Sequence, residues 1–155
     1  VPHNIIGPRQ KYDDPFRNVV SIMINRMMQG KAPIIYGDGK QTRCFSYIDD
    51  CVYCLGEMLQ NDLVVGEVIN IGPDEEITSI NELSKEIISL TNFSGEPIFL
   101  PERPQEVKHA ICSSEKARKI LDYGTKVSLR DGLEQTWEWF KSNAEEYKLK
   151  KNYFK

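Results

Sequence analysis

Two arginines stand on segments that are predicted to be non-helical, and both could bind an anion. Arg43 lies in "YGDGKQTRCFSYIDD", between the Asp38-Gly39 turn and an aromatic-rich strand, and Arg103 lies in the proline-bracketed loop "LPERPQEVKHA". Because guanidinium groups match the oxygens of phosphates, the pair could clamp a diphosphate. The alternative is a pair of solvated surface arginines, with Arg43 beside Asp38 and Arg103 beside Glu102.

Two more side chains would fit that chemistry. Asn4, at the end of the first predicted strand, could add an amide donor, and Tyr36 could offer a flat face to a nucleobase. The sequence shows no nucleophile elbow, no phosphate-binding glycine-rich loop and no metal motif. The sequence therefore contains residues suited to binding a ligand but no recognisable group of catalytic residues.

The cysteines raise a different possibility. Cys51 and Cys54 have the Cys-x-x-Cys spacing of a redox pair, which would make the chain a thiol-redox protein. The preceding Asp49 and Asp50 would raise a thiol pKa rather than lower it, so we expect the two cysteines to be unreactive packing residues on a helix. A zinc site would need two further ligands, and no second close pair follows.

Composition sets the class of protein. The chain has 155 residues, is 40% hydrophobic and 28% charged, and carries a net charge of −3, which predicts a folded domain and argues against nucleic acid or an anionic membrane as a partner. With no apolar run of transmembrane length and no signal peptide, a cytoplasmic location is expected. The chain opens at Val1 in what reads as a strand already under way, which suggests a piece of a longer protein.

Strands and helices alternate along the chain, which predicts an α/β or α+β class. A hairpin is expected across Asp38-Gly39, and the capping boxes Ser79-x-x-Glu82 and Ser128-x-x-Asp131 predict two helix starts. The expected strands are 1–6, 33–36, 42–48, 67–71 and 97–100. The expected helices are 16–29, about 50–61, one from 80, 114–121 and one from 129. The side chains expected to face the core are Val52, Leu55, Met58 and Leu59 in the second helix, and Leu129, Leu133, Trp137 and Phe140 in the last.

Four blocks of the sequence carry a family resemblance: "PHNIIGPRQ", "IIYGDGKQTRCFSYIDD", "VINIGPDEEITSINEL" and "ERPQEVKHAICSSEKARKIL". Together they resemble the C-terminal half of extended short-chain dehydrogenase/reductase enzymes, the NAD-dependent nucleotide-sugar epimerases and dehydratases that are UDP-galactose 4-epimerase-like. The resemblance implies an α/β fold, the C-terminal part of a Rossmann-type enzyme, with a small mixed α/β substrate-binding domain plus stray Rossmann elements. Residues 1–145 would be the nucleotide-sugar-binding portion, and residues 146–155 a basic tail.

The resemblance also implies roles for individual residues. Arg43 and Arg103 would bind the substrate diphosphate, Asn4 would donate to it, and Glu106 would accept from the nucleotide ribose, where relatives usually have Asp. The other implied contacts are Asn18 and Val19 over the nucleotide and sugar, Ile34 and Tyr36 beside the uracil, and Pro2 and His3 near the nicotinamide end of NAD. The family often reads Arg-x-Gly-Asp where this chain has Arg-Pro-Gln-Glu, so the exact sugar nucleotide stays open.

The family's catalytic machinery does not stand out in this sequence. Relatives bind NAD on a Gly-x-x-Gly-x-x-Gly turn and use a Tyr-x-x-x-Lys pair. Here no tyrosine precedes a lysine at that offset in a suitable setting, since Tyr147 and Lys151 lie in the basic tail. We therefore expect a substrate-binding portion that is inactive alone and that self-associates through exposed apolar surface, from a parent enzyme that is a homodimer. A non-catalytic nucleotide-sugar-binding module is the alternative. The sequence does not separate epimerase, dehydratase and decarboxylase.

Overall fold

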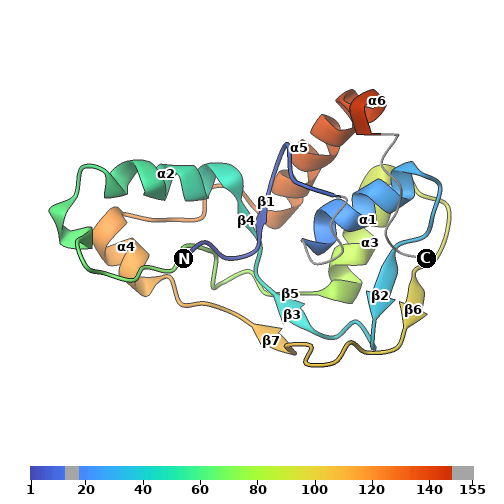
Figure 1. Cartoon of the computed structure of the whole chain (residues 1–155), viewed down its shortest axis with the longest axis horizontal. Coiled ribbons are helices and arrows are strands. Elements are labelled where there is room, and N and C mark those ends of the chain that lie inside the picture. Colours follow the sequence, from blue (N-terminus) through green and yellow to red (C-terminus); the bar gives the residue numbers. More distant parts are fainter. Residues whose placement is uncertain (13–17, 148–155) are drawn as a thin grey trace.

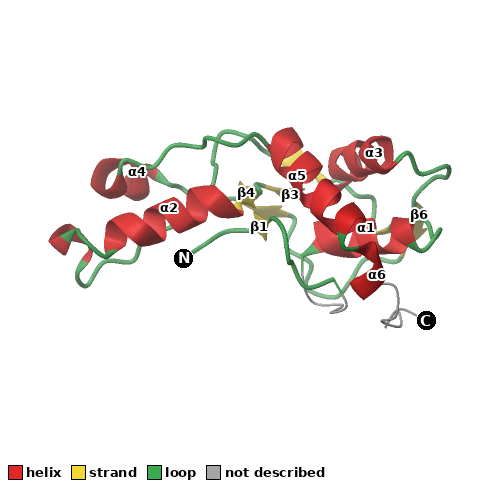
Figure 2. Ribbon diagram, turned by 90° about the horizontal axis from the view of Figure 1, so that it is seen from above, coloured by secondary structure: helices red, strands yellow, loops and turns green. Residues whose placement is uncertain are grey.

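The computed structural model describes residues 1–12 and 18–147 of the chain. The molecule is elongated, with α2 and α4 in an arm at one end and α1, α3, α5, β2 and β6 in a larger lobe at the other (Figures 1 and 2). The helices are α1 (Val19–Met28), α2 (Ile48–Met58), α3 (Ile80–Thr91), α4 (Glu115–Leu121), α5 (Leu129–Ser142) and α6 (Ala144–Tyr147), with a 3₁₀ turn at Asp62–Val64. The strands are β1 (Ile5–Ile6), β2 (Ile34–Tyr36), β3 (Thr42–Arg43), β4 (Ser46–Tyr47), β5 (Thr78–Ser79), β6 (Ile98–Leu100) and β7 (His109–Ala110). The predicted mixed α/β class is confirmed.

The strands form three small sheets. β1 pairs with β4 in parallel, β2 pairs with β6 in parallel, and β3 lies between antiparallel β5 and parallel β7. Every expected strand is shorter than predicted, most of all in the segments 1–6, 42–48 and 67–71. Of 1–6 only Ile5–Ile6 forms a strand, β1. The 42–48 segment is divided into β3 and β4, and of 67–71 only Ile71 makes a bridge, with Pro2.

The predicted hairpin across Asp38-Gly39 is wrong, because β2 and β3 do not pair with each other. The turn is held by other elements instead. Asn81 donates from its backbone N–H to the Gly39 carbonyl at 3.0 Å and from its amide to the Asp38 carbonyl at 2.8 Å. Gly39 has φ +71°, and a Cβ there would overlap the Asn81 side chain, so this position needs glycine. The turn therefore directs β3 toward α3 and away from β2.

The core of the larger lobe lies between α1, α3 and α5, as predicted for α5. Leu133 and Phe140 are fully buried, Leu129 is buried, and Trp137 packs against them. Both predicted caps are confirmed. Ser79 and Glu82 exchange the two bonds of a capping box, and the Ser128 hydroxyl accepts from the Asp131 N–H at 3.1 Å. These local bonds satisfy N–H groups that a helix start leaves without partners.

The inward face predicted for α2 is wrong at Val52, Leu55 and Leu59, whereas Met58 packs against the buried cluster as predicted. Cys51 and Cys54 are buried, whereas Val52, Leu55 and Leu59 are 54%, 49% and 87% exposed. The helix has apolar residues on both faces, and periodicity alone does not say which face a neighbour covers. In the structure the cysteine face packs on a small cluster that includes residues of α4 and the 67–71 segment.

Asp50 connects α2 to the segment before α5 and does not cap its own helix. Its side chain is 3% exposed, and one carboxylate oxygen accepts from the N–H groups of Lys126 and Val127 at 3.2 and 3.3 Å. Buried polar groups are stable only when they are paired in this way. The contact spans 76 positions of sequence, which a local pattern does not reveal.

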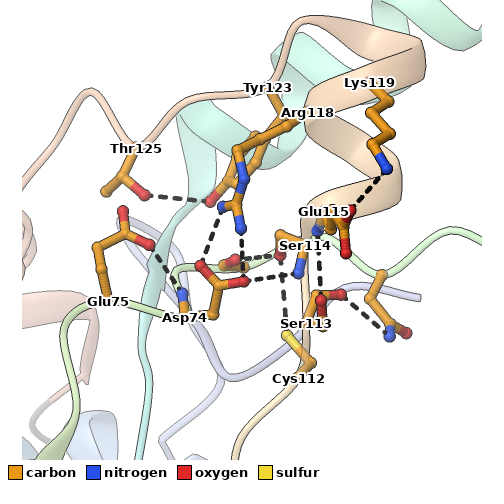
Figure 3. A network of polar contacts seen from close by, with 12 residues as sticks. Asp74, Glu75, Cys112, Ser113, Ser114, Glu115, Arg118, Lys119, Tyr123 and Thr125 are labelled. Carbon is orange, nitrogen blue, oxygen red and sulfur yellow. Dashed lines mark hydrogen bonds and ion pairs between the residues drawn. The ribbon is translucent and has the colours of Figure 1, made fainter.

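A second carboxylate, on the partly buried Asp74, joins α4 to the loop after Ile71 (Figure 3). Both terminal nitrogens of Arg118 donate to Asp74, at 2.9 and 2.8 Å, and the Ser114 N–H donates to it at 2.9 Å. Ser114 also donates from its hydroxyl to the Gly72 carbonyl. The bond from Arg118 holds the pKa of Asp74 well below its usual range, with the Ser114 N–H adding to the effect.

Replacing Asp74 with asparagine is expected to lower the free energy of unfolding by about 1–2 kcal/mol at pH 7, a range reduced for solvent screening of the half-exposed Arg118. Because the pKa of Asp74 is depressed in the folded state, its contribution is present above the ordinary aspartate pKa of about 4 and is lost as the pH falls below it. Urea unfolding of both proteins at pH 7 and pH 3 measures this. An equal difference at the two pH values would contradict it.

Candidate nucleotide-binding site

A cavity of about 570 Å³ opens between α1, the 37–41 turn, the loop after β6 and the first residues of the chain. This size is typical of small-molecule sites. Its lining residues are Asn4, Ile5, Gln10, Lys11, Asn18, Val19, Ile22, Met23, Arg26, Ile34, Tyr36, Gln41, Arg43, Phe45, Ile80, Arg103 and Glu106. All eight residues predicted to contact substrate are in this set, although they come from distant parts of the chain. Their role as ligand contacts stays a prediction.

The two residues predicted to lie near NAD, Pro2 and His3, do not line this cavity. Pro2 forms a bridge with Ile71, and the His3 ring lies 3.2 Å from the Ala110 carbonyl through Nε2. The structure thus separates them from the eight predicted substrate contacts.

Arg43 is held on β3 with its guanidinium partly buried. One terminal nitrogen donates to the Thr42 carbonyl at 2.8 Å and the other to Glu106 at 3.0 Å, with both charged side chains at most 20% exposed. The alternative partner, Asp38, instead pairs with Lys40 at 3.7 Å. Arg43 therefore faces the cavity beside the one carboxylate among the lining residues.

Arg103 is positioned by an aromatic ring. Its guanidinium carbon lies 3.9 Å from the centre of the Tyr36 ring, a cation–π contact. Within the described part of the chain its guanidinium has no hydrogen-bond acceptor, and the alternative ion pair with Glu102 is not formed. The donors of Arg103 therefore remain available to a ligand.

Two asparagines border the cavity from the N-terminal side. Asn4 has φ +41°, a conformation that asparagine tolerates better than most residues, and its amide donates to the Cys44 carbonyl at 2.9 Å. Asn4 is thus bonded to the residue that directly follows Arg43. Asn18 caps α1 by accepting from the Val20 N–H and donates to the Ile5 carbonyl, so its amide is already used for structure.

Among the described residues, the lining of the cavity has four cations and one anion, although the whole chain carries a net charge of −3. The cations are Lys11, Arg26, Arg43 and Arg103, and the anion is Glu106. Sequence reasoning missed Arg26, which is 7% exposed and donates from Nε to the Ala32 carbonyl at 2.8 Å. Its spacing of eight from Asn18 puts both on one helix face, a signal that was present. Such a set of charges favours an anionic ligand.

The residues present do not fit the diphosphate of NAD. The sequence has no Gly-x-x-Gly-x-x-Gly, and the Gly37-Asp38-Gly39 turn leads into a strand rather than a helix start. Tyr36 and Lys40 have the Tyr-x-x-x-Lys spacing but stand on either side of that turn, with the Lys40 side chain 83% exposed. A helix would place the two side chains on one face, and this turn does not. We derive no catalytic step from these residues.

The thiols are buried away from the cavity. Cys51 and Cys54 are free and buried in the α2–α4 arm, and burial raises the pKa of Cys54 to about 11 and that of Cys51 above its ordinary value. A raised pKa removes the thiolate that redox chemistry needs. Among the described residues no group of three or more His, Cys, Asp or Glu side chains could hold a metal ion, and no helix is long and apolar enough to cross a membrane.

Cys51 and Cys54 of the folded chain are expected to react slowly with a thiol reagent at pH 7.5, because they are neither exposed nor ionised. The partly exposed Cys112 is the control, since a Cys112→Ser variant should lose most of the fast reaction. Labelling of all four cysteines should follow unfolding in guanidinium chloride. Rapid modification of Cys51 or Cys54 in the folded protein, located by mass spectrometry, would count against it.

Comparison with known proteins agrees with this arrangement. The profile of the family described as GDP-mannose 4,6 dehydratase matches residues 1–136. A UDP-N-acetyl-alpha-D-glucosaminuronate decarboxylase of Bacillus cytotoxicus is 35% identical over 144 residues, which are 89% of this chain and 44% of that protein.

Solved structures show the same relationship. An epimerase of Methanothermobacter thermautotrophicus superposes with a TM-score of 0.89 at 32% identity, over 95% of this chain and 44% of that one. The UDP-glucuronic acid 4-epimerase of Bacillus cereus, solved with UDP-glucuronic acid and NAD, gives 0.81 at 35% identity, over 91% and 44%. The chain thus spans less than half the length of these relatives. By sequence and by fold, it belongs to the GDP-mannose 4,6 dehydratase family of extended short-chain dehydrogenase/reductase proteins.

Proposed function

We propose that the chain is the substrate-binding, C-terminal portion of an NAD-dependent nucleotide-sugar epimerase, dehydratase or decarboxylase, and that its cavity binds the nucleoside diphosphate of a UDP-sugar. The observation that carries the proposal is that Arg43, Arg103 and Asn4 border one cavity. The NAD and the reacting groups would belong to the rest of the enzyme.

The geometry supports distinct tasks for the charged groups. Arg103, with free donors and a position fixed by the Tyr36 ring, would bind a phosphate oxygen directly. Arg43 would bind the diphosphate with those of its N–H groups that do not donate to Thr42 or Glu106. Glu106, held in place by Arg43, would accept from a ribose hydroxyl, because a carboxylate can only accept. Binding of this kind orients the sugar for the reaction.

Titration calorimetry with UDP and uridine tests the proposal on the 155-residue chain. UDP should bind at least about tenfold more tightly than uridine, because one charge-assisted hydrogen bond is worth roughly 1.5–3 kcal/mol. Raising the salt concentration should weaken UDP binding alone, since only UDP is charged. Equal affinities for UDP and uridine would refute the proposal.

The exposed apolar face of the arm is expected to drive self-association. We propose that in the complete enzyme, a homodimer, this face packs on the NAD-binding portion, and exposed apolar area of this kind promotes contact between copies when it is uncovered. Its residues are Val52, Leu55, Leu59, Leu63, Val65 and Val68. Sedimentation velocity should show oligomers of the wild-type chain, and a Leu55→Lys, Leu59→Lys variant should shift to monomer. A wild-type chain that stays monomeric at millimolar concentration would contradict this.

A further inference from the structure

Arg26 is a buried cation for which the described residues provide no counter-charge. Its side chain is 7% exposed and borders the cavity, yet none of the ion pairs in the described part of the chain includes it. Its Nε donates to the Ala32 carbonyl at 2.8 Å, while its two terminal nitrogens have no acceptor among the described residues. Its terminal nitrogens therefore border the water-accessible cavity, and a ligand that displaced this water would have to supply the acceptor.

The part of the cavity around Arg26 is apolar. On α1, the side chains one turn before Arg26 are Ile22 and Met23, and both line the cavity. On β2, Ile34 and Tyr36 also line it, while the intervening Ile35 is 1% exposed and lies in the core, as the alternation of a strand requires. A flat, largely apolar ring suits this section, because Ile22, Met23 and Ile34 are apolar and cannot replace the hydration that a charged group would lose there.

We infer that the terminal nitrogens of Arg26 donate to a carbonyl oxygen on the edge of the ligand's nucleobase, so that the chain selects keto bases over amino bases. The inference rests on the proposed function, because it requires that the cavity bind a nucleoside diphosphate. A guanidinium has only donors. Uracil presents a carbonyl at the position where cytosine presents an amino group, and an amino group facing Arg26 would leave donors on both sides unpaired.

Titration of the 155-residue chain with UDP and CDP tests the inference, since the two ligands differ only at that edge of the base. The wild-type chain should bind UDP about tenfold or more tightly than CDP, the discrimination typical of one good base contact. Arg26→Met keeps the length of the side chain and removes its donors. It should weaken UDP binding by about tenfold, leave CDP binding within about twofold, and so remove the preference.

A matched control is Arg130→Met, which removes an arginine of α5 that does not line the cavity and pairs with Glu86 and Glu134. It should leave both affinities unchanged. If thermal unfolding shows that Arg26→Met does not fold, Arg26→Lys should keep part of the preference for UDP, because it retains a charged donor. The ratio measured for the wild-type chain is independent of either variant.

The outcomes separate this inference from the proposed function. Equal binding of UDP and CDP by the wild-type chain, with UDP still much tighter than uridine, overturns the role of Arg26 alone. Equal weakening of UDP and CDP by Arg26→Met would also overturn it, because it would place Arg26 on a phosphate. Binding of UDP no tighter than uridine, or no binding of any nucleotide, overturns both.

Discussion

Alanine at Arg43 or at Arg103 is expected to weaken binding of UDP-glucose by about tenfold to a hundredfold, the equivalent of roughly 1.5–3 kcal/mol. Each arginine would make charge-assisted bonds to the diphosphate from a backbone that is already fixed. Lysine at either position should recover only part of the loss, because an ammonium cannot form two parallel bonds to one phosphate. Calorimetric titration measures the affinity of UDP-glucose for the wild-type 155-residue chain and for the four variants, alanine and lysine at each position.

Adding Glu106→Gln should affect the Arg43→Ala and Arg103→Ala variants differently. Arg43→Ala also removes the partner of Glu106, so part of its effect comes from a carboxylate left without a cation in the cavity. Arg43→Ala combined with Glu106→Gln should therefore bind more tightly than Arg43→Ala alone. Arg103 has no such partner, and Glu106→Gln should not improve Arg103→Ala.

The matched control for these variants is Arg130→Ala, which lies outside the cavity lining. Arg118, which looks like a simple surface arginine in the sequence, is a poorer control because it makes two bonds to Asp74. Unchanged UDP-glucose binding by both Arg43→Ala and Arg103→Ala, in folded proteins, would show that the diphosphate does not bind between them.

No epimerisation, dehydration or decarboxylation is expected when the 155-residue chain is incubated with NAD and UDP-glucose or UDP-glucuronic acid. The described residues contain no glycine-rich turn at a helix start, and the Tyr36–Lys40 pair stands across a turn rather than on one helix face. Without a fixed nicotinamide and a positioned base, the barrier to hydride transfer is not lowered. Proton NMR of the sugar over several hours measures turnover.

The UDP-glucuronic acid 4-epimerase of Bacillus cereus serves as a positive control in the same assay. Turnover by the chain that rises with protein concentration would contradict the prediction. Tyr36→Phe would then be the first variant to examine, since Tyr36 is the described tyrosine that lines the cavity and precedes a lysine by four positions.

The sequence by itself determined the features that depend on neighbouring residues. The serine caps at Ser79 and Ser128 and the buried stripe of α5 were predicted correctly because a helix start and a helix face are set by residues three or four positions apart. The resemblance to the family named all eight residues that line the cavity. Six of them stand within the quoted blocks, and Asn18 and Val19 lie between the first two blocks. Their types, above all two arginines on non-helical segments, already indicated an anionic ligand.

The tertiary structure decided which elements meet. The Asp38-Gly39 turn has the composition of a hairpin, but bonds from Asn81 hold it, and β2 pairs with β6 across 64 positions of sequence. Which face of α2 is buried depended on the neighbouring elements that cover it. Asp50 accepts hydrogen bonds from a loop 76 positions further along the chain. Arg26 became a candidate ligand contact only when the fold showed it at the cavity, buried and with no carboxylate partner among the described residues. Each of these features depends on the burial and pairing of groups far apart in the chain, which local patterns do not encode.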